Sequence, residues 1–212
     1  DLRTTTIHLD LINTETNQLE RISIVNPQVK TGSDVISRIL YCMNGKEHAA
    51  DLREMILHEI ETLLESRSIP KQSVIAIFTA GNSVMETILA GFPVNSLGHH
   101  PFWTTWDGGD WQEIYQIPFF FLPLVSAFIG GDAVVQSLHP DLALKDSCLL
   151  IDLGTNAEII WKNGNQIHAA SCAAGPAFEG GNISCGCPAI SGAIDEVWEE
   201  GFHTLGNEPP IG

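Results

Sequence analysis

Two short stretches of the sequence carry the same carboxylate and hydroxyl residues in the same order. DLRTTT occupies residues 1–6, which we call loop 1, and DLGTNAE occupies residues 152–158, which we call loop 2. A hydroxyl-rich turn presents backbone N–H groups that suit phosphate oxygens, and a carboxylate beside it can hold Mg²⁺, usually through water. Two such loops facing each other across a cleft would hold the phosphates and the metal of a nucleotide from both sides.

The two copies differ at their third residue, where loop 1 has Arg3 and loop 2 has Gly154. Glycine takes positive φ and lets the backbone approach an anion closely. Arg3 is therefore predicted to strain the turn by about 1–3 kcal/mol, or alternatively to hold a phosphate through its guanidinium. The copies begin 152 − 1 = 151 residues apart, which favours a duplicated domain over a solenoid, whose repeats are about 20–50 residues long.

The patterns around both loops predict the elements that position them. Residues 4–25 have the alternation and polar turn of a β-hairpin. Three strands predicted over residues 148–153, 157–161 and 166–171 repeat this arrangement around and after loop 2, with Asn163-Gly164 as a hairpin turn. Loop 1 and loop 2 are therefore each expected at the tip of a hairpin.

The segment between the two loops is predicted to alternate strands and helices. Apolar spacing of three and four predicts helices over residues 34–43, 48–67 and 83–90. SVIAIF at residues 73–78 predicts a buried strand, and residues 119–138 predict a buried strand followed by a helix, whereas residues 93–117 are the least regular part. A strand that runs through a glycine turn into a helix places that turn at the carboxyl edge of a sheet.

Composition excludes several classes of function. Ten Lys and Arg against 26 Asp and Glu give a net charge of −16 and a pI near 4.6, so we expect no nucleic-acid partner. The longest apolar run, residues 119–131, contains Pro123 and is shorter than the roughly 20 residues of a membrane helix, so we expect no membrane partner.

Five scattered cysteines favour a reducing, cytoplasmic location. Because Asp1 already lies in a motif, the chain is expected to be a piece of a longer protein.

The paired loops resemble those of the ATPase superfamily of sugar kinases, heat-shock chaperones and actin. The resemblance implies an α/β fold of duplicated ribonuclease-H-like domains with mixed sheets and hairpin phosphate loops. Residues 1–145 would form the first domain and residues 146–212 the start of a second, incomplete one.

A closer resemblance, along nearly the whole chain, is to the ATPase module of the reductive activators of corrinoid proteins. The sequence blocks that carry it are TTT at 4–6, NPQ at 26–28, GSDVISRI at 32–39, AGNSVM at 80–85, PLVSAFIGGD at 123–132, IDLGTNAEI at 151–159, AAGPAFEGGNISCG at 173–186, SGAIDEV at 191–197 and GNEPPIG at 206–212. The resemblance implies that ATP hydrolysis is coupled to the reduction of a corrinoid from Co(II) to Co(I), with ATP and Mg²⁺ as cofactors. The electron would come from an iron–sulfur domain upstream, and the partners would be a corrinoid protein and a second copy of the chain in a homodimer.

The same resemblance assigns roles to particular residues. Asp1 and Asp152 would lie near Mg²⁺ and, with Glu158, carry the chemistry. The nucleotide would be bound by residues of both loops and of the cleft rim: Thr4, Thr5, Thr6, Asn82, Asp132, Gly154, Thr155, Asn156, Gly175 and Glu179. Asp132 is alternatively the N-cap of the helix that follows it.

Three other interpretations remain open. Arg3 favours a non-catalytic interaction module that keeps the fold without ATP turnover, with an acidic or Trp-rich surface as its working part. A kinase for a small molecule would share the phosphate loops and differ in its acceptor. Trp103, Trp106 and Trp111 either contact a partner or cover a local hydrophobic patch.

Overall fold

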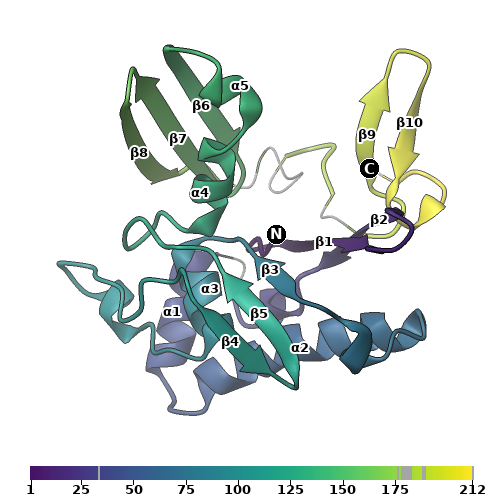
Figure 1. The fold of residues 1–212 in the computed structure, drawn as a ribbon, viewed down its shortest axis with the longest axis horizontal. Coiled ribbons are helices and arrows are strands. Elements are labelled where there is room, and N and C mark those ends of the chain that lie inside the picture. Colours follow the sequence, from purple (N-terminus) through teal and green to yellow (C-terminus); the bar gives the residue numbers. More distant parts are fainter. Residues whose placement is uncertain (33, 176, 178–182, 188–189, 212) are drawn as a thin grey trace.

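The computed structural model describes residues 1–212 except residues 33, 176, 178–182, 188–189 and 212, and it shows a mixed α/β fold (Figure 1). The strands are β1 (Thr6–Ile12), β2 (Leu19–Val25), β3 (Ile77–Thr79), β4 (Trp111–Ile114), β5 (Ile117–Phe121), β6 (Ser147–Leu153), β7 (Asn156–Asn163), β8 (Gln166–Ala173), β9 (Ile194–Trp198) and β10 (Gly201–Thr204). The helices are α1 (Val35–Met43), α2 (His48–Ser66), α3 (Ser83–Ala90), α4 (Gly131–Ser137) and α5 (Pro140–Ala143).

A single residue joins the two sheets of residues 1–145. β1 and β2 form an antiparallel hairpin, while β5 pairs in parallel with β3 and antiparallel with β4. Leu2 forms an antiparallel bridge to Ile7 and a parallel bridge to Gly81. Leu2 therefore stands in the place of a central strand, and the order across both sheets is β2, β1, Leu2, β3, β5 and β4.

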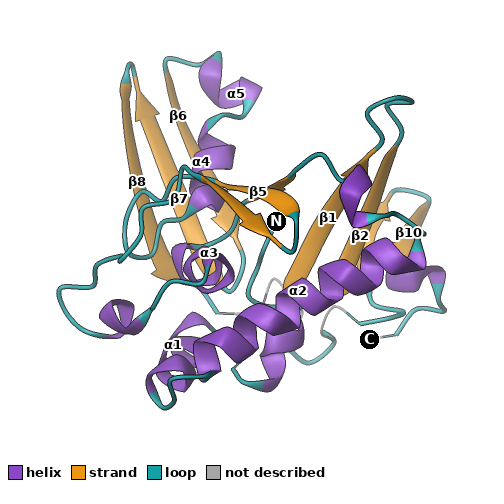
Figure 2. Cartoon of the chain, turned by 60° about the horizontal axis from the view of Figure 1, so that its bottom comes forward, coloured by secondary structure: helices purple, strands orange, loops and turns teal. Residues whose placement is uncertain are grey.

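Helices α2 and α3 supply the apolar cover of these strands, and α1 packs against both of these helices. Ile56 and Ile60 of α2, Met85 of α3 and Phe119 and Phe121 of β5 belong to one buried cluster. Figure 2 shows α2 running from beside α1 to the β1–β2 hairpin, and at that far end the Arg67 Nη2 atom lies 2.8 Å from Glu20 Oε1 of β2. The helix thereby fixes both sheets against one core.

Residues 146–212 form a separate meander and a hairpin. β6, β7 and β8 are antiparallel neighbours, and β9 pairs with β10. Ala133 of α4, Leu142 of α5 and Ile160 of β7 form a small buried cluster between the helices and the meander. Figure 1 shows the meander and the β9–β10 hairpin projecting on opposite sides of the N-terminal segment.

Most of the predicted elements are confirmed, but the strand predicted at residues 73–78 is shorter and more exposed than predicted. Lys71–Ser73 form a 3-10 turn, and only Ile77–Thr79 pair with β5. An uninterrupted apolar run predicts a strand covered on both faces, whereas Phe78 is 68% exposed. Its ring contacts Trp111 and Phe120 at 5.6 and 5.8 Å between centroids, so aromatic neighbours replace a covering layer.

The irregular stretch at residues 93–117 divides its tryptophans between two roles. Trp106 is 9% exposed and stacks on Phe92 at 5.3 Å, so it belongs to the core. Trp103 and Trp111 are each 56% exposed. This stretch also contains β4, which its composition did not predict. No helix in the described part of the chain is long and apolar enough to cross a membrane.

A fully buried guanidinium anchors loop 1 to the helices. Arg38 of α1 donates to the carbonyl oxygen of Thr4, to Gln28 Oε1 at 2.9 Å and to the carbonyl oxygen of Gly32 at 3.2 Å. Burial lowers the pKa of Arg38 to about 10, so it remains charged at neutral pH. Arg38 thereby holds the backbone of loop 1 from the side of the helices, in the protein interior.

We predict that Arg38→Met lowers the free energy of unfolding by about 3 kcal/mol or more, because two buried acceptors and one half-buried acceptor lose their donor. Urea denaturation measures this loss. Arg67→Met, which breaks the half-exposed pair with Glu20, is the matched control and should cost no more than about 1 kcal/mol. Equal losses in the two variants would contradict the anchoring role of Arg38.

Candidate functional site

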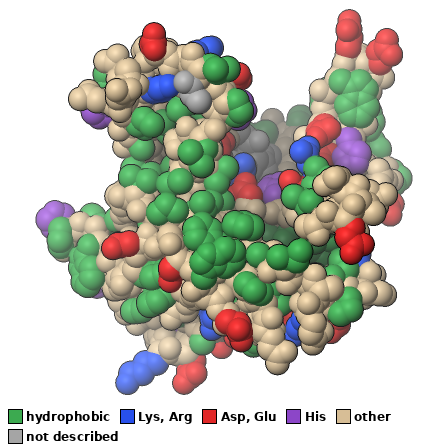
Figure 3. All heavy atoms as spheres, in the orientation of Figure 1, with side chains coloured by type: hydrophobic (Ala, Val, Ile, Leu, Met, Phe, Trp, Pro, Cys, Tyr) green, Lys and Arg blue, Asp and Glu red, His purple; other side chains and the backbone are tan. Residues whose placement is uncertain are grey.

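Loop 1 and loop 2 line one cavity of about 280 Å³. In Figure 3 the surface is hollowed between the two projections of Figure 1, with acidic and basic side chains at its floor. Nine of the residues predicted for the site line this cavity: Asp1, Thr4, Asn82, Asp132, Asp152, Gly154, Thr155, Asn156 and Glu158.

Loop 2 is the tight turn between β6 and β7. The Gly154 N–H donates to the Asn156 carbonyl at 2.9 Å, and Asp152 lies opposite Glu158 in the strand register. Glu158 is only 8% exposed and accepts a hydrogen bond from Ser171 Oγ at 3.2 Å. Both carboxylates therefore come from neighbouring strands at the same end of the meander.

Loop 1 makes a similar turn that is one residue longer. Leu2 pairs with Ile7 across residues 3–6, whereas Leu153 pairs with Ala157 across residues 154–156. The extra residue places His8 opposite Asp1, with backbone hydrogen bonds of 2.7 and 2.9 Å between them. His8 thus occupies the place that Glu158 holds in the second copy.

The three threonines of loop 1 do not share one role. Thr4 lines the cavity, and its Oγ1 lies 3.4 Å from Asn82 Nδ2. Thr6 lies outside the cavity lining, with its Oγ1 3.1 Å from His8 Nε2, and Thr5 does not line the cavity either. Gly175 donates its N–H to the Thr155 carbonyl at 2.9 Å without lining the cavity. Glu179 lies outside the described residues.

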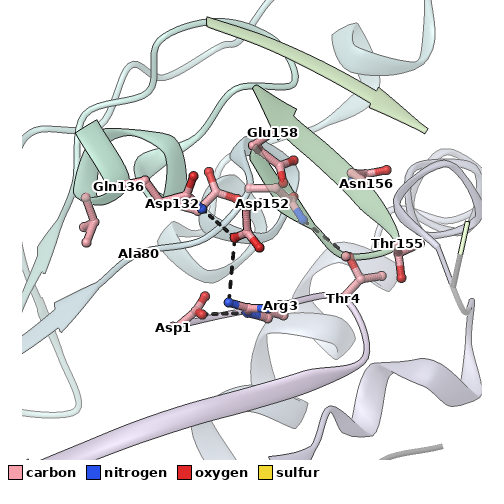
Figure 4. A pocket seen from close by; sticks show the side chains of 13 residues that line it. Asp1, Arg3, Thr4, Ala80, Asp132, Gln136, Asp152, Thr155, Asn156 and Glu158 are labelled. Atoms are coloured by element: carbon pink, nitrogen blue, oxygen red, sulfur yellow. Dashed lines mark hydrogen bonds and ion pairs between the residues drawn. The ribbon is translucent and has the colours of Figure 1, made fainter. Parts of the chain in front are cut away.

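The predicted backbone strain at Arg3 is wrong. Neither Arg3 nor Gly154 has positive φ, so this position of the turn does not require glycine. The Arg3 side chain instead points between the two loops, where Nε lies 2.7 Å from Asp1 Oδ2 and Nη2 lies 3.8 Å from Asp152 Oδ2 (Figure 4). The arginine therefore bridges the two aspartates that were predicted to lie near Mg²⁺.

Two helix starts complete the rim of the cavity. Asn82 caps α3 through its Oδ1, which accepts from the Met85 N–H at 3.0 Å. Asp132 lies in the first turn of α4, but the cap position belongs to Gly130, so the N-cap interpretation of Asp132 is wrong. Its Oδ1 accepts from the Ala133 N–H at 2.7 Å, and its carboxylate lines the cavity.

The cavity carries more negative charge than Arg3 neutralises. Burial, followed by the repulsion of Asp152, raises the pKa of Asp132. Burial, followed by the repulsion of Asp132, raises the pKa of Glu158 to about 7. Mutual repulsion of this kind is relieved by a bound cation.

These residues fit Mg²⁺ held mainly through water and phosphate. Within the described ranges, no three or more His, Cys, Asp or Glu side chains gather into a direct metal site. Mg²⁺ usually keeps several waters and takes one or two carboxylates together with substrate phosphates. Asp1, Asp132 and Asp152 supply carboxylates of that kind around the cavity.

Sequence reasoning missed three residues of the lining, of which Gln136 is the most informative. Its Nε2 donates to Asp152 Oδ2 at 2.6 Å, and its buried Oε1 has no partner among the residues that the structure describes. Gln136 follows Asp132 by one helical turn, and this spacing of four would have placed both on one face of α4. Ala80 and Val135 carry no such polar signal.

A buried carboxyl group beneath the cavity was also missed. Glu86 of α3 is fully buried, and its Oε1 accepts from the Gly81 N–H at 2.6 Å, while Oε2 has no partner in the described part of the structure. Burial raises the pKa of Glu86 to about 9, so the group is protonated at neutral pH. The lone acid in the apolar stretch SVMETILA was the available signal.

Comparison with known proteins identifies the family of the chain. The family described as "RACo middle region" matches residues 1–145, and "C-terminal domain of RACo the ASKHA domain" matches residues 146–212. The chain belongs to the RACo family. A solved structure titled "Reductive activator for corrinoid,iron-sulfur protein" superposes on 99% of the chain with a TM-score of 0.84 and 28% identity, and the match covers 37% of that protein. The predicted α/β fold of the actin and sugar-kinase superfamily is thereby confirmed for this RACo family member.

Two curated relatives carry names from the same field. "Corrinoid activation enzyme RamQ" of Eubacterium limosum is 30% identical over 92% of the chain and 35% of its own length. The "[Co(II) methylated amine-specific corrinoid protein] reductase" of Methanosarcina barkeri is 44% identical over 38% of the chain and 15% of its own length. The RACo family chain thus spans about a third or less of the length of these relatives.

We predict that Glu86→Gln changes the pH dependence of stability. Because the folded-state pKa of about 9 lies above the ordinary value of 4.5, the proton on Glu86 contributes stability that is fully present below pH 4.5 and is lost as pH rises toward 9. The unfolding free energy of the native chain should fall relative to the variant by about 2–4 kcal/mol between pH 5 and pH 8.

Urea denaturation at a series of pH values measures this difference. Glu65→Gln, at an exposed position of α2, is the matched control and should leave the pH profile unchanged. A profile for Glu86→Gln that runs parallel to the native one would contradict a protonated Glu86.

Proposed function

We propose that the chain is the ATP-binding module of a protein that reductively activates corrinoid proteins, returning Co(II) to Co(I) with ATP hydrolysis. The observation that carries this proposal is that two loops of the same sequence pattern line one acidic cavity, and each contributes an aspartate to it that pairs with Arg3. Membership of the RACo family and the names of the relatives support the corrinoid as the target.

Each part of the cavity then has a role in phosphoryl transfer, where positioning and charge neutralisation supply most of the catalysis. Asp1 and Asp152 would hold Mg²⁺ through water, and the metal supplies countercharge to the phosphates. Thr4, Thr155 and the backbone of loop 2 donate to phosphate oxygens. Glu158, with a pKa of about 7, suits the acceptance of a proton from the attacking water, because a general base acts best near its operating pH.

The two parts of the chain would divide the work between them. Residues 1–145 would form the first ribonuclease-H-like domain and residues 146–212 would belong to the second, with the nucleotide held where they meet. Closure of the two around ATP would change how the corrinoid is presented to an iron–sulfur donor upstream, as substrate-induced domain closure does in other enzymes. A cytoplasmic homodimer acting on a corrinoid protein is part of the same proposal.

One observation favours a second candidate, a non-catalytic interaction module. Arg3 already pairs with Asp1 and approaches Asp152, so the aspartates have a countercharge without metal. Calorimetry with Mg-ATP separates the two candidates, because a module that has lost nucleotide binding gives no heat in the native chain or in Arg3→Gly.

We predict that Asp152→Asn weakens Mg-ATP binding at least about tenfold, or about 1.4 kcal/mol, because it removes one carboxylate from the metal's surroundings. Isothermal titration calorimetry measures the affinity. Asp195→Asn, which breaks the 2.7 Å pair with His203 on the β9–β10 hairpin, is the matched control and should bind as the native chain does. Unchanged affinity in Asp152→Asn would count against the proposed site.

We further predict that release of ADP by the whole protein depends on the presence of a Co(II) corrinoid protein. The assay follows ADP together with the absorption change from Co(II) to Co(I), with an iron–sulfur electron donor supplied. Glu158→Gln should slow ADP release at least tenfold while binding ATP normally. ADP release that depends on an added sugar or organic acid would favour a small-molecule kinase instead.

A further inference from the structure

Arg3 brings a cationic side chain into an otherwise acidic cavity. Among the described residues that line the cavity, it is the one Lys or Arg, and it shares the lining with Asp1, Asp132, Asp152 and Glu158. Figure 4 shows its guanidinium between the aspartates of the two loops, joined to each by a dashed line. The shorter contact, Nε to Asp1 Oδ2, is 2.7 Å, and the longer, Nη2 to Asp152 Oδ2, is 3.8 Å.

The backbone of loop 1 holds Arg3 in this place. The Arg3 N–H donates to the Thr6 carbonyl at 3.0 Å, and the Arg3 carbonyl accepts from Asn26 Nδ2 at 2.8 Å. Asn26 is fully buried, so the second contact fixes the turn from the interior. With φ outside the left-handed region, the arginine adopts this turn without backbone strain, and its side chain extends toward the cavity.

The bridge connects segments that are far apart in the sequence. Asp1 precedes β1, whereas Asp152 lies at the end of β6. In a chain with glycine at both third positions, the facing carboxylates would need a cation from solution to offset their repulsion. Here the cation is a side chain of loop 1 itself.

We propose that Arg3 is a built-in counter-ion that ties loop 1 to loop 2 without a metal and competes with the divalent cation for Asp1 and Asp152. The inference rests on the proposed nucleotide site and adds to it a residue that sets the metal requirement. The competition is reversible, because the Arg3 and Asp152 side chains are 42% and 31% exposed and ion pairs of that kind are weak. Mg²⁺ that arrives with a nucleotide can therefore displace the guanidinium.

The experiment measures Mn²⁺ binding to the nucleotide-free protein, from the loss of the free Mn²⁺ electron paramagnetic resonance signal. Arg3→Gln is expected to bind Mn²⁺ at least tenfold more tightly than the native chain. Arg21→Gln is the matched control: Arg21 makes an exposed 3.7 Å pair with Asp10 on the β1–β2 hairpin, so the substitution removes the same charge away from the cavity. This control should bind Mn²⁺ as the native chain does.

Equal Mn²⁺ affinity in Arg3→Gln and Arg21→Gln overturns the inference, because the effect is then one of net charge alone or is absent. Arg3→Gly, which reproduces the residue of loop 2, is the second variant and should bind Mn²⁺ as tightly as Arg3→Gln; circular dichroism verifies that both fold. Parallel calorimetry with ATP separates the two ideas. If neither the native chain nor any variant binds ATP, the proposed function is refuted. The Mn²⁺ comparison still decides the role of Arg3 in that case.

Discussion

The site depends on the close approach of three backbone segments at Gly81. The Leu2 N–H donates to the Ala80 carbonyl at 2.6 Å, and the Asp132 N–H donates to the Gly81 carbonyl at 3.1 Å. A Cβ at Gly130 would lie 2.2 Å from the Gly81 carbonyl oxygen, so no other residue fits there without movement. Loop 1, the start of α3 and the start of α4 therefore meet at one point, and Asp1, Asn82 and Asp132 face the same cavity because of it.

Buried polar groups stabilise this junction where apolar packing alone would not specify it. Glu86 holds the Gly81 N–H from the α3 side, and Arg38 holds the Thr4 carbonyl from the α1 side. A buried polar group is costly to leave unpaired, so each of these contacts selects one position of the loop over its alternatives. The cavity keeps its shape through contacts that lie outside its lining.

The local patterns of the sequence predict most of the fold. The β1–β2 hairpin, the β6–β8 meander and helices α1 to α3 follow from periodicity and capping, because those signals act within a few residues. The failures need distant information. Phe78 lies on an open sheet face, which a run of apolar residues does not reveal, and the cap of α4 is Gly130 rather than Asp132. Leu2 replaces a whole strand by two bridges, and no propensity detects a strand of one residue.

The sequence predicts which residues form the candidate site, but it does not predict how their charges interact. Repetition of the Asp-Leu-x-Thr pattern is enough to make Asp1 and Asp152 candidates, and the family resemblance adds Glu158. The strain predicted at Arg3 assumed that its turn has the positive φ for which glycine is favoured, and the structure shows an ordinary turn instead. The electrostatic effect of Arg3 depends on which carboxylates it contacts. One of them, Asp152, is 149 residues away in the sequence (152 − 3 = 149), so local patterns do not reveal the contact.

The unequal lengths of loop 1 and loop 2 limit how the two copies can be exchanged by engineering. A graft of residues 154–156 in place of residues 3–6 would shorten the turn by one position. The Leu2–Ile7 pair would then close a turn of three residues, as the Leu153–Ala157 pair does, so the register of β1 would be kept. The carbonyl groups of Arg3, Thr4 and Thr5, which accept from Asn26 and Arg38, would however have to be replaced with one residue fewer. The two loops are alike in sequence, yet the longer one holds contacts to the buried residues beneath it that a turn of three residues has too few carbonyl groups to reproduce.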